Sequence, residues 1–311
     1  MILVNNPLNN PLLLPVIVRL LAILGAGLVV VLLFTIKNIK GLFQSEVWKR
    51  FIAWVFMAPT FLLGVFLGGI PALLFISFLL FKATSEYWEM LNLPFIYRKI
   101  LLANAVVSLI VSIAFPEIVT LLPVFYFLLT ILVSILNNQL EEIFNNVCYT
   151  LFGSIWISFT LVHFLLFPSF PRGQNLLILI GFSVALADIF AFCIGKLFYK
   201  LRIGVNYRIA NLISPNKTYA GTLGNITGAV AGVLIFSPLN TDISVNVLII
   251  MGICIGISSI LGDLSESMIK RFTDVKDSSD SIPGHGGFLD RIDSLLIVII
   301  VCFYFIKFFT A

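Results

Sequence analysis

Charged residues are scarce in this chain. Of its 311 residues, 11% are Asp, Glu, Lys or Arg, whereas 60% are apolar. So little charge cannot cover the surface of a soluble domain, and the composition therefore predicts a polytopic integral membrane protein of the all-α class. No basic stripe is interleaved with aromatic residues, which argues against nucleic acid as a partner.

Cysteine and histidine are also rare, with four and two residues respectively. The cysteines are scattered in or beside apolar segments, so they predict neither a disulfide framework nor a metal site. We expect them to be small buried hydrophobes (Cys148, Cys193, Cys254 and Cys302). His163 stands alone within an apolar stretch, and we expect a structural role for it.

Long apolar runs, by contrast, are abundant. About ten are long enough to cross a bilayer as helices, which takes roughly 17–25 residues. We expect these spans near residues 14–36, 51–69, 71–90, 99–115, 118–136, 147–167, 176–198, 222–239, 246–268 and 292–309. The first run exceeds the roughly 7–15-residue core of a signal peptide, and no small-residue cleavage site follows it, so we expect a retained span.

The basic residues predict the orientation of these spans. Alternate links carry fifteen Lys and Arg residues, against three on the opposite side. Because cytoplasmic links are enriched in Lys and Arg, we expect the basic links to be cytoplasmic and both termini to lie on the other side of the membrane.

Glycine recurs every fourth residue in the eighth and ninth spans. The eighth carries Gly224, Gly228 and Gly232, and the ninth carries Gly252 and Gly256. Small residues at this spacing let helix backbones approach closely. We expect these glycines to press the two spans together.

Charge returns in one segment near the C-terminus. Residues 263–293 hold seven of the fifteen acidic residues and four of the nineteen basic ones. Charge is costly at a membrane, so its concentration indicates a functional site. Within the segment, residues 283–287 read Pro-Gly-His-Gly-Gly, which cannot be helical and supplies backbone N–H groups suited to phosphate oxygens.

The helical spacing of this segment favours a metal-bound nucleotide. Asp263, Ser267 and Lys270 share one face, with Glu266 beside Asp263. Asp290 opens the last span and can fold back towards Asp263, which would make a hard-oxygen site suited to Mg²⁺. Alternatively, Asp263 and Lys270 form an interfacial pair at the headgroups.

Three further groups of polar residues lie outside this segment. Ser214 and Pro215 predict a turn, followed by Lys217 and by Thr218 as a helix cap; such a basic loop binds phosphate or attracts anionic lipid. Asp188 lies mid-span and needs a partner within the bundle, with Lys196 or a backbone group as the structural alternative. Glu86 and Glu89 flank Tyr87-Trp88 near an interface, and we expect both to be solvated.

These residues resemble the CDP-diacylglycerol synthases, the phosphatidate cytidylyltransferases. Their signature reads Ser, two residues, Lys-Arg, four residues, Lys-Asp, a hydrophobic-Pro-x-His-Gly-Gly turn and Asp-Arg-x-Asp. It is matched by Ser267, Lys270, Arg271, Lys276, Asp277, Ile282, Pro283, His285, Gly286, Gly287, Asp290, Arg291 and Asp293. Asp188, the 214–218 loop, Lys49-Arg50 and residues 86–89 also fit, so the resemblance covers roughly 48–308. The chain departs from the family pattern at Ala220, Ile189 and Phe192.

The resemblance divides the chain into two parts. Residues 48–311 are interpreted as a cytidylyltransferase-like membrane domain with catalytic loops at 199–221 and 263–293. Residues 1–47 are interpreted as an extra N-terminal transmembrane helix with a basic cytoplasmic link.

The resemblance also implies a reaction, in which CMP passes from CTP to phosphatidate with Mg²⁺ and pyrophosphate is released. A second cation and a homodimer are left open. The alternatives are another CTP-using membrane lipid enzyme, such as a polyprenol kinase, or a transporter. A transporter is disfavoured because charge gathers at one face and no halves repeat.

Chemistry and resemblance together suggest a role for each polar residue. Asp263 and Asp290 are the expected metal ligands, and Asp188 supports the site. The catalytic set is Asp263, Ser267, Lys270, Arg271, His285 and Asp290. The substrate-binding set is Ser214, Lys217, Thr218, Lys276, Asp277, Gly286, Gly287, Arg291 and Asp293.

Overall fold

The computed structural model describes residues 10–35, 43, 45–137, 142–201, 208–282 and 286–310. Ten helical segments in these ranges coincide with the ten predicted spans. Eight of them are long and apolar enough to cross a membrane, whereas α1 (Leu13–Thr35) and α2 (Glu46–Leu67) contain shorter apolar stretches. The all-α prediction is thereby confirmed, as expected where lipid leaves the backbone to satisfy its own hydrogen bonds.

The chain divides into two compact units. Met1–Phe75 with Asp280–Gly286 forms the first, and Ile76–Ser279 with Gly287–Ala311 forms the second. In the first unit α1 packs against α2. Ser45 caps α2 by accepting a hydrogen bond from the backbone N–H of Trp48 at 3.2 Å. Helix α3 (Gly69–Met90) begins in the first unit and continues into the second.

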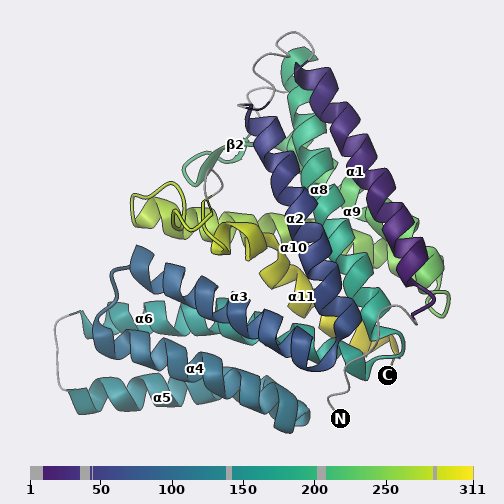
Figure 1. Cartoon of the computed structure of the whole chain (residues 1–311). Helices are drawn as coiled ribbons and strands as arrows, with labels where there is room; N and C mark the ends of the chain where they lie inside the picture. Colours follow the sequence, from purple (N-terminus) through teal and green to yellow (C-terminus); the bar gives the residue numbers. More distant parts are fainter. Residues whose placement is uncertain are drawn as a thin grey trace. The chain divides into compact units, whose positions relative to one another are not determined.

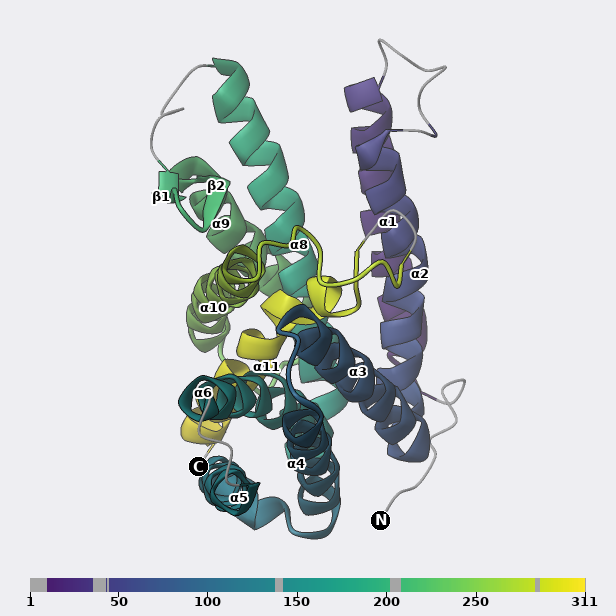
Figure 2. The same ribbon diagram turned by 90° about the vertical axis from the view of Figure 1, so that its left-hand side faces the viewer.

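The second unit holds the other helices. Three of them lie side by side, namely α4 (Phe95–Ala114), α5 (Leu122–Asn137) and α6 (Ile143–Gly153) (Figure 1; Figure 2). Helix α6 continues through a π-helical turn at Ser154–Phe159, α7 (Thr160–Val162) and a 3-10 segment at His163–Ser169. The chain then forms α8 (Gly173–Leu201), α9 (Tyr219–Phe236), α10 (Val245–Phe272) and α11 (Leu289–Thr310).

Buried polar side chains link the helices of this unit. Asn104 of α4 donates to the Ser154 hydroxyl at 2.8 Å, and the Ser108 and Tyr126 hydroxyls lie 2.5 Å apart between α4 and α5. Such hydrogen bonds join helices where lipid offers no alternative partner. His163 is fully buried within hydrogen-bond distance of the Phe159 carbonyl and the Tyr304 hydroxyl, which confirms its predicted structural role.

The predicted glycine contacts are only partly as expected. Helix α10 does press against α9, because a Cβ on Gly252 or Gly256 would lie 2.9 Å from Val230 Cα or 2.7 Å from Ile226 Cα. The α9 glycines, however, face α8 rather than α10. A Cβ on Gly224, for example, would lie 2.7 Å from the Phe190 carbonyl oxygen. The spacing identified a close contact, but it could not say which neighbour makes it.

Two further expectations need correction. The predicted Ser214-Pro215 turn is a strand: β1 (Arg208–Ala210) pairs antiparallel with β2 (Ser214–Thr218). Pro215 is tolerated because a short two-stranded ribbon leaves edge positions that need no N–H. The cysteines are not uniformly buried either, since Cys302 is buried, Cys193 and Cys254 are half-buried and Cys148 is exposed.

Candidate active site

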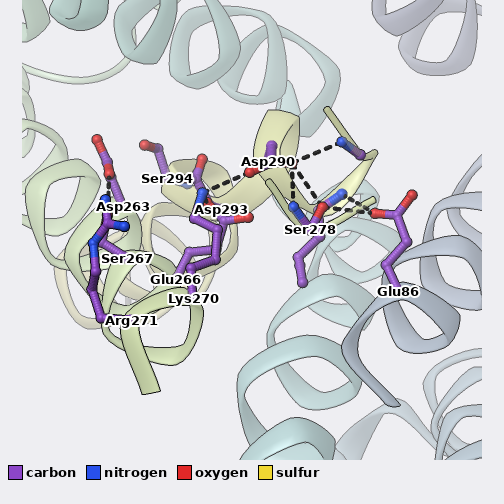
Figure 3. A network of polar contacts seen from close by, with 12 residues as sticks. Glu86, Asp263, Glu266, Ser267, Lys270, Arg271, Ser278, Asp290, Asp293 and Ser294 are labelled. Carbon is purple, nitrogen blue, oxygen red and sulfur yellow. Dashed lines mark hydrogen bonds and ion pairs between the residues drawn. The ribbon is translucent and has the colours of Figure 1, made fainter. Parts of the chain in front are cut away.

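Charged side chains from two helices and the β-hairpin meet at one end of α10 and α11 (Figure 3). The hairpin lies beside α9 and α10 (Figure 2). Figure 3 shows Glu266 and Lys270 between Asp263 on one side and Asp290 on the other. The polar groups of the 263–293 segment therefore face the start of α11.

Lys217 connects the hairpin to α10. Its Nζ lies 2.6 Å from Asp263 Oδ2, and the Ser267 hydroxyl donates to Asp263 Oδ1 at 3.3 Å. Thr218 follows Lys217 and caps α9 by accepting from the Gly221 N–H at 3.1 Å, as predicted. The cap holds the end of β2 at the start of α9, and so holds Lys217 beside Asp263.

Arg271 makes a second link between the hairpin and α10. Its Nε donates to the backbone carbonyl of Ile213 at 3.3 Å, in the turn that precedes Ser214. The Arg271 side chain is exposed. The hairpin is therefore held at both of its ends, by Arg271 at the turn and by Lys217 at the end of β2.

Lys270 connects α10 to α11. Its Nζ lies 2.7 Å from Glu266 Oε2 on the same helix and 2.6 Å from Asp290 Oδ1 on α11. The alternative pair of Asp263 with Lys270 is therefore wrong, because each of these residues has a different partner. One turn of helix separates Glu266 from Lys270, so both point towards α11.

Asp290 is held on both of its carboxylate oxygens. Oδ1 accepts from Lys270, while Oδ2 accepts from the Ser278 N–H at 2.9 Å, the Ser278 hydroxyl at 2.8 Å and the Gly287 N–H at 2.7 Å. In this structure Asp290 is thus turned towards Lys270 and the preceding loop. The prediction that it binds a metal together with Asp263 stays a prediction.

Among the described residues, the carboxyl groups of Asp293 and Asp188 lie close enough to Asp263 to interact with it electrostatically. Asp293 is buried at the start of α11, where its Oδ1 accepts a hydrogen bond from the Ser294 N–H at 2.6 Å. Asp188 is an accessible side chain of α8 that interacts with Lys217 and with both aspartates. Its alternative partner Lys196 instead lies over the Phe192 ring, 4.9 Å from the centroid.

The composition of the site suits a divalent cation. Five carboxyl groups share it with four basic side chains (Asp188, Asp263, Glu266, Asp290 and Asp293 with Lys217, Lys270, Arg271 and Arg291). Carboxyl groups therefore outnumber basic side chains in the site, and carboxylate oxygens are the ligands that Mg²⁺ prefers. Glu266 Oε1 is buried without a hydrogen-bond partner among the described residues. In that part of the chain no three acidic, histidine or cysteine residues form a ready-made metal cage.

Glycine is required at the two positions after His285 for different structural reasons. Gly286 adopts φ 76°, a conformation that side chains with a Cβ rarely take. Gly287 is closely approached, because a Cβ there would clash with the Ser278 hydroxyl and the Glu86 carboxylate. Both were predicted to bind substrate, and that role stays a prediction.

Some predicted site residues lie apart from the charged network. Lys276 and Asp277 are exposed, and within the described ranges neither side chain makes a hydrogen bond or ion pair. Ser214 begins β2 at the turn, three residues before Lys217, and His285 lies outside the described residues.

Glu86 is the residue that the sequence interpretation missed. Predicted to be solvated, it is only 2% exposed and accepts hydrogen bonds from the 278–289 region (Figure 3). Glu89 is exposed, as predicted. Helical spacing could have separated the two, because Glu86 lies three residues after Ala83 and four before Met90, both of which are buried.

Comparison with known proteins agrees with this geometry. The profile of the Cytidylyltransferase family matches residues 48–309. The chain belongs to that family. It is an integral, multi-pass membrane protein of the cytidylyltransferase family, and the match contains all the site residues described above.

Several curated relatives within the family are named phosphatidate cytidylyltransferase. The protein from Synechocystis sp. is 40% identical over 139 residues, covering 44% of this chain and 45% of that protein. The Thermotoga maritima protein is 33% identical, covering 56% of this chain and 64% of its own length. The Rickettsia bellii protein is 32% identical, covering 58% and 80% respectively. The chain spans about a third to a half of the length of most curated relatives that it matches.

Proposed function

We propose that this chain is a phosphatidate cytidylyltransferase. It transfers CMP from CTP to phosphatidate, giving CDP-diacylglycerol and pyrophosphate. The observation that carries the proposal is the meeting of Lys217, Lys270 and the carboxylates of α10 and α11 at one site, in a chain of the cytidylyltransferase family. The names of the relatives supply the acceptor lipid.

The reaction needs charge neutralisation and positioning more than it needs a protein nucleophile. A phosphate oxygen of phosphatidate attacks the α-phosphorus of CTP and forms a new P–O bond. The bond from that phosphorus to the bridging oxygen breaks in line, and pyrophosphate leaves with the electron pair. The acceptor is already anionic at neutral pH, so no covalent enzyme intermediate is required.

The basic residues bind the triphosphate in this proposal. Lys217 and Lys270 each hold a carboxylate in the structure, so their ammonium groups are already positioned within a negatively charged site. Phosphate oxygens can replace the exposed contact of Lys217 with Asp263 when CTP enters, while Lys270 offers its third N–H and keeps its two carboxylate contacts. Arg271 and Ser267 lie on the same end of α10; Arg271 contacts further phosphate oxygens, and Ser267 either donates to them or keeps its contact with Asp263.

Asp263 and Asp290 would hold Mg²⁺, with Asp293 and Asp188 adding negative charge nearby. A bound divalent cation would neutralise charge that builds up on the phosphates. Lys270 keeps Asp290 oriented, and Ser267 does the same for Asp263. His285, which lies outside the described residues, is expected from the family signature to act on the leaving pyrophosphate.

We also propose the sidedness of the site. The segments 199–218 and 270–288 face the cytoplasm, where CTP is available, and both termini face the opposite side. The excess of Lys and Arg in these links supports this orientation. Phosphatidate reaches the site from within the leaflet, because its acyl chains are costly to move into water.

The decisive experiment uses the purified full-length chain in lipid nanodiscs with phosphatidate, Mg²⁺ and CTP. One CTP sample carries label in cytidine and another in the γ-phosphate. Cytidine label in the lipid product supports the proposal. Transfer of the γ-phosphate alone would indicate a lipid kinase, and no transfer of either label would contradict both.

A further inference from the structure

Glu86 lies far from the charged segment in sequence but touches it in space. Its Oε1 accepts from the Ser279 hydroxyl at 2.8 Å and from the Phe288 N–H at 3.0 Å. Its Oε2 accepts from the Leu289 N–H at 2.8 Å and lies 3.2 Å from the Ser278 hydroxyl. One carboxylate therefore holds the two ends of the 278–289 region together.

Two of these donors are the amides at the start of α11. The first N–H groups of a helix have no partner within the helix, and a carboxylate is favoured there by the helix dipole. Glu86 supplies that carboxylate from α3 rather than from the local chain. Asp290 is the second residue of α11, so a cap on Phe288 and Leu289 fixes the backbone that carries it.

Ser278 connects the two carboxylates directly. Its hydroxyl lies 2.8 Å from Asp290 Oδ2 and 3.2 Å from Glu86 Oε2, while its N–H donates to Asp290. The single hydroxyl hydrogen serves one carboxylate at a time, and the backbone N–H serves Asp290 throughout. Ser278 therefore links the Glu86 and Asp290 carboxylates through a single residue.

The rest of α3 supports the same contact. Phe78 packs edge-on against the Phe288 ring at 5.2 Å, and Lys82 Nζ lies 5.9 Å from that ring. Phe78, Lys82 and Glu86 are spaced by four residues, so one face of α3 contacts the start of α11. The contact between the Phe78 and Phe288 rings would be enough to hold α3 against the start of α11. A buried carboxylate is not needed for that purpose and is costly unless it is hydrogen-bonded. We therefore attribute to Glu86 the orientation of the specific donors that it binds.

From these contacts we propose that Glu86 is a positioning residue for the cytidylyl transfer. It fixes the start of α11 and Ser278, and through them it sets the orientation of Asp290 towards Lys270 and the reacting phosphates. The inference rests on the proposed function where activity is concerned, but the positioning of the 286–290 backbone can be measured without it.

The test compares Glu86→Gln with Glu89→Gln in nanodiscs. The two residues lie one turn apart on α3, but only Glu86 is buried. For Glu86→Gln we expect kcat to fall roughly 10–100-fold, as is typical when a residue that orients a metal ligand is replaced. The KM for CTP should change much less, and the Mg²⁺ concentration for half-maximal rate should rise. Glu89→Gln should match the wild type.

Hydrogen–deuterium exchange provides the readout that does not depend on activity. In Glu86→Gln the amides of Phe288 and Leu289 should exchange faster, while those of α4 keep their wild-type rates. Unchanged exchange at these two amides, or unchanged kcat in an active protein, would overturn the proposal. If the wild type proves inactive, the proposed function fails, and the exchange data still decide whether Glu86 holds the start of α11.

Ser279→Ala covers the case in which Glu86→Gln does not fold. This variant removes one donor to Glu86 and leaves the carboxylate in place. We expect a several-fold lower kcat and faster exchange of the same amides, without loss of folded protein. If Ser279→Ala has the wild-type kcat and wild-type amide exchange, and Glu86→Gln does not fold, then Glu86 has a purely structural role and the proposal is overturned.

Discussion

The Lys217 ammonium lies 2.6 Å from the Asp263 carboxylate and joins the β-hairpin to α10. Their side chains are 22% and 41% exposed, so the pair is open to exchange with a ligand from solution. Lys270 and Asp290, at 15% and 8%, form a more buried pair. The site thus contains one accessible and one protected lysine–carboxylate pair, which should respond differently to substitution.

Replacing either proposed metal ligand should abolish most of the activity. We expect Asp263→Asn and Asp290→Asn each to lower the rate by about 100-fold or more, because each removes a charge that a cation and the transition state require. The measurement is the rate of labelled CDP-diacylglycerol formation against Mg²⁺ concentration, with thermal melting to confirm folding. Near-normal turnover of either variant at ordinary Mg²⁺ would remove that residue from the metal site.

The two lysines should bind nucleotide rather than lipid headgroups. Lys270→Gln should raise the KM for CTP, lower kcat, or both, with a smaller effect for the more exposed Lys217→Gln. Attraction of anionic lipid would be worth only about 1 kcal/mol per lysine and would depend on salt.

Lipid composition separates these two explanations for the lysines. Lys99→Gln is a matched control, since Lys99 is an exposed basic residue of α4 that lies over the Phe95 ring. Recovery of Lys270→Gln activity in anionic nanodiscs would show that Lys270 acts on lipid.

Gly287 should tolerate no side chain. In Gly287→Ala the new Cβ would occupy the space of the Ser278 hydroxyl and the Glu86 carboxylate, so both must move. We expect a cost of about 1–3 kcal/mol in stability, as for other overpacked sites, together with a lower kcat. Gly25→Ala is the control, because a Cβ at Gly25 meets nothing within 4 Å. Equal melting temperatures and rates for the two variants would contradict the close approach.

Sidedness can be tested with single cysteines in a background without the native ones, which matters because Cys148 is exposed. Lys276→Cys, at an exposed position, should react with impermeant maleimide from the cytoplasmic side. Asn5→Cys should react from the opposite side. Labelling of both positions from one side would mean that an even number of spans separates them, where we expect nine.

Length and apolarity were sufficient to locate the helices. A bilayer leaves few alternatives to a helix of about 20 residues, so α8, α10 and α11 appear where the hydrophobic runs predict them. The hairpin could not be predicted in this way. Its strands of three and five residues carry too little periodicity, and a Ser-Pro pair within a strand looks like a turn.

The residues of the site could be predicted better than their partners. Spacing placed Asp263, Ser267 and Lys270 on one helix, but it could not show that Lys270 would pair with Asp290 and Asp263 with Lys217. Those pairs depend on how α9, α10 and α11 pack. Glu86 was missed for a related reason, because its position beside Trp88 suggested an interface while its burial depends on contacts with a distant segment.

The glycines of α9 and α10 restrict how a lipid can approach the site. A Cβ on Gly228 would clash with the Leu186 carbonyl of α8, and one on Gly256 would lie 2.7 Å from Ile226 Cα of α9. Backbones in such contact leave no seam wide enough for an acyl chain. At these positions the α8–α9 and α9–α10 junctions are closed, and under the proposed function phosphatidate would have to bring its phosphate to the site from a different side of the helix cluster.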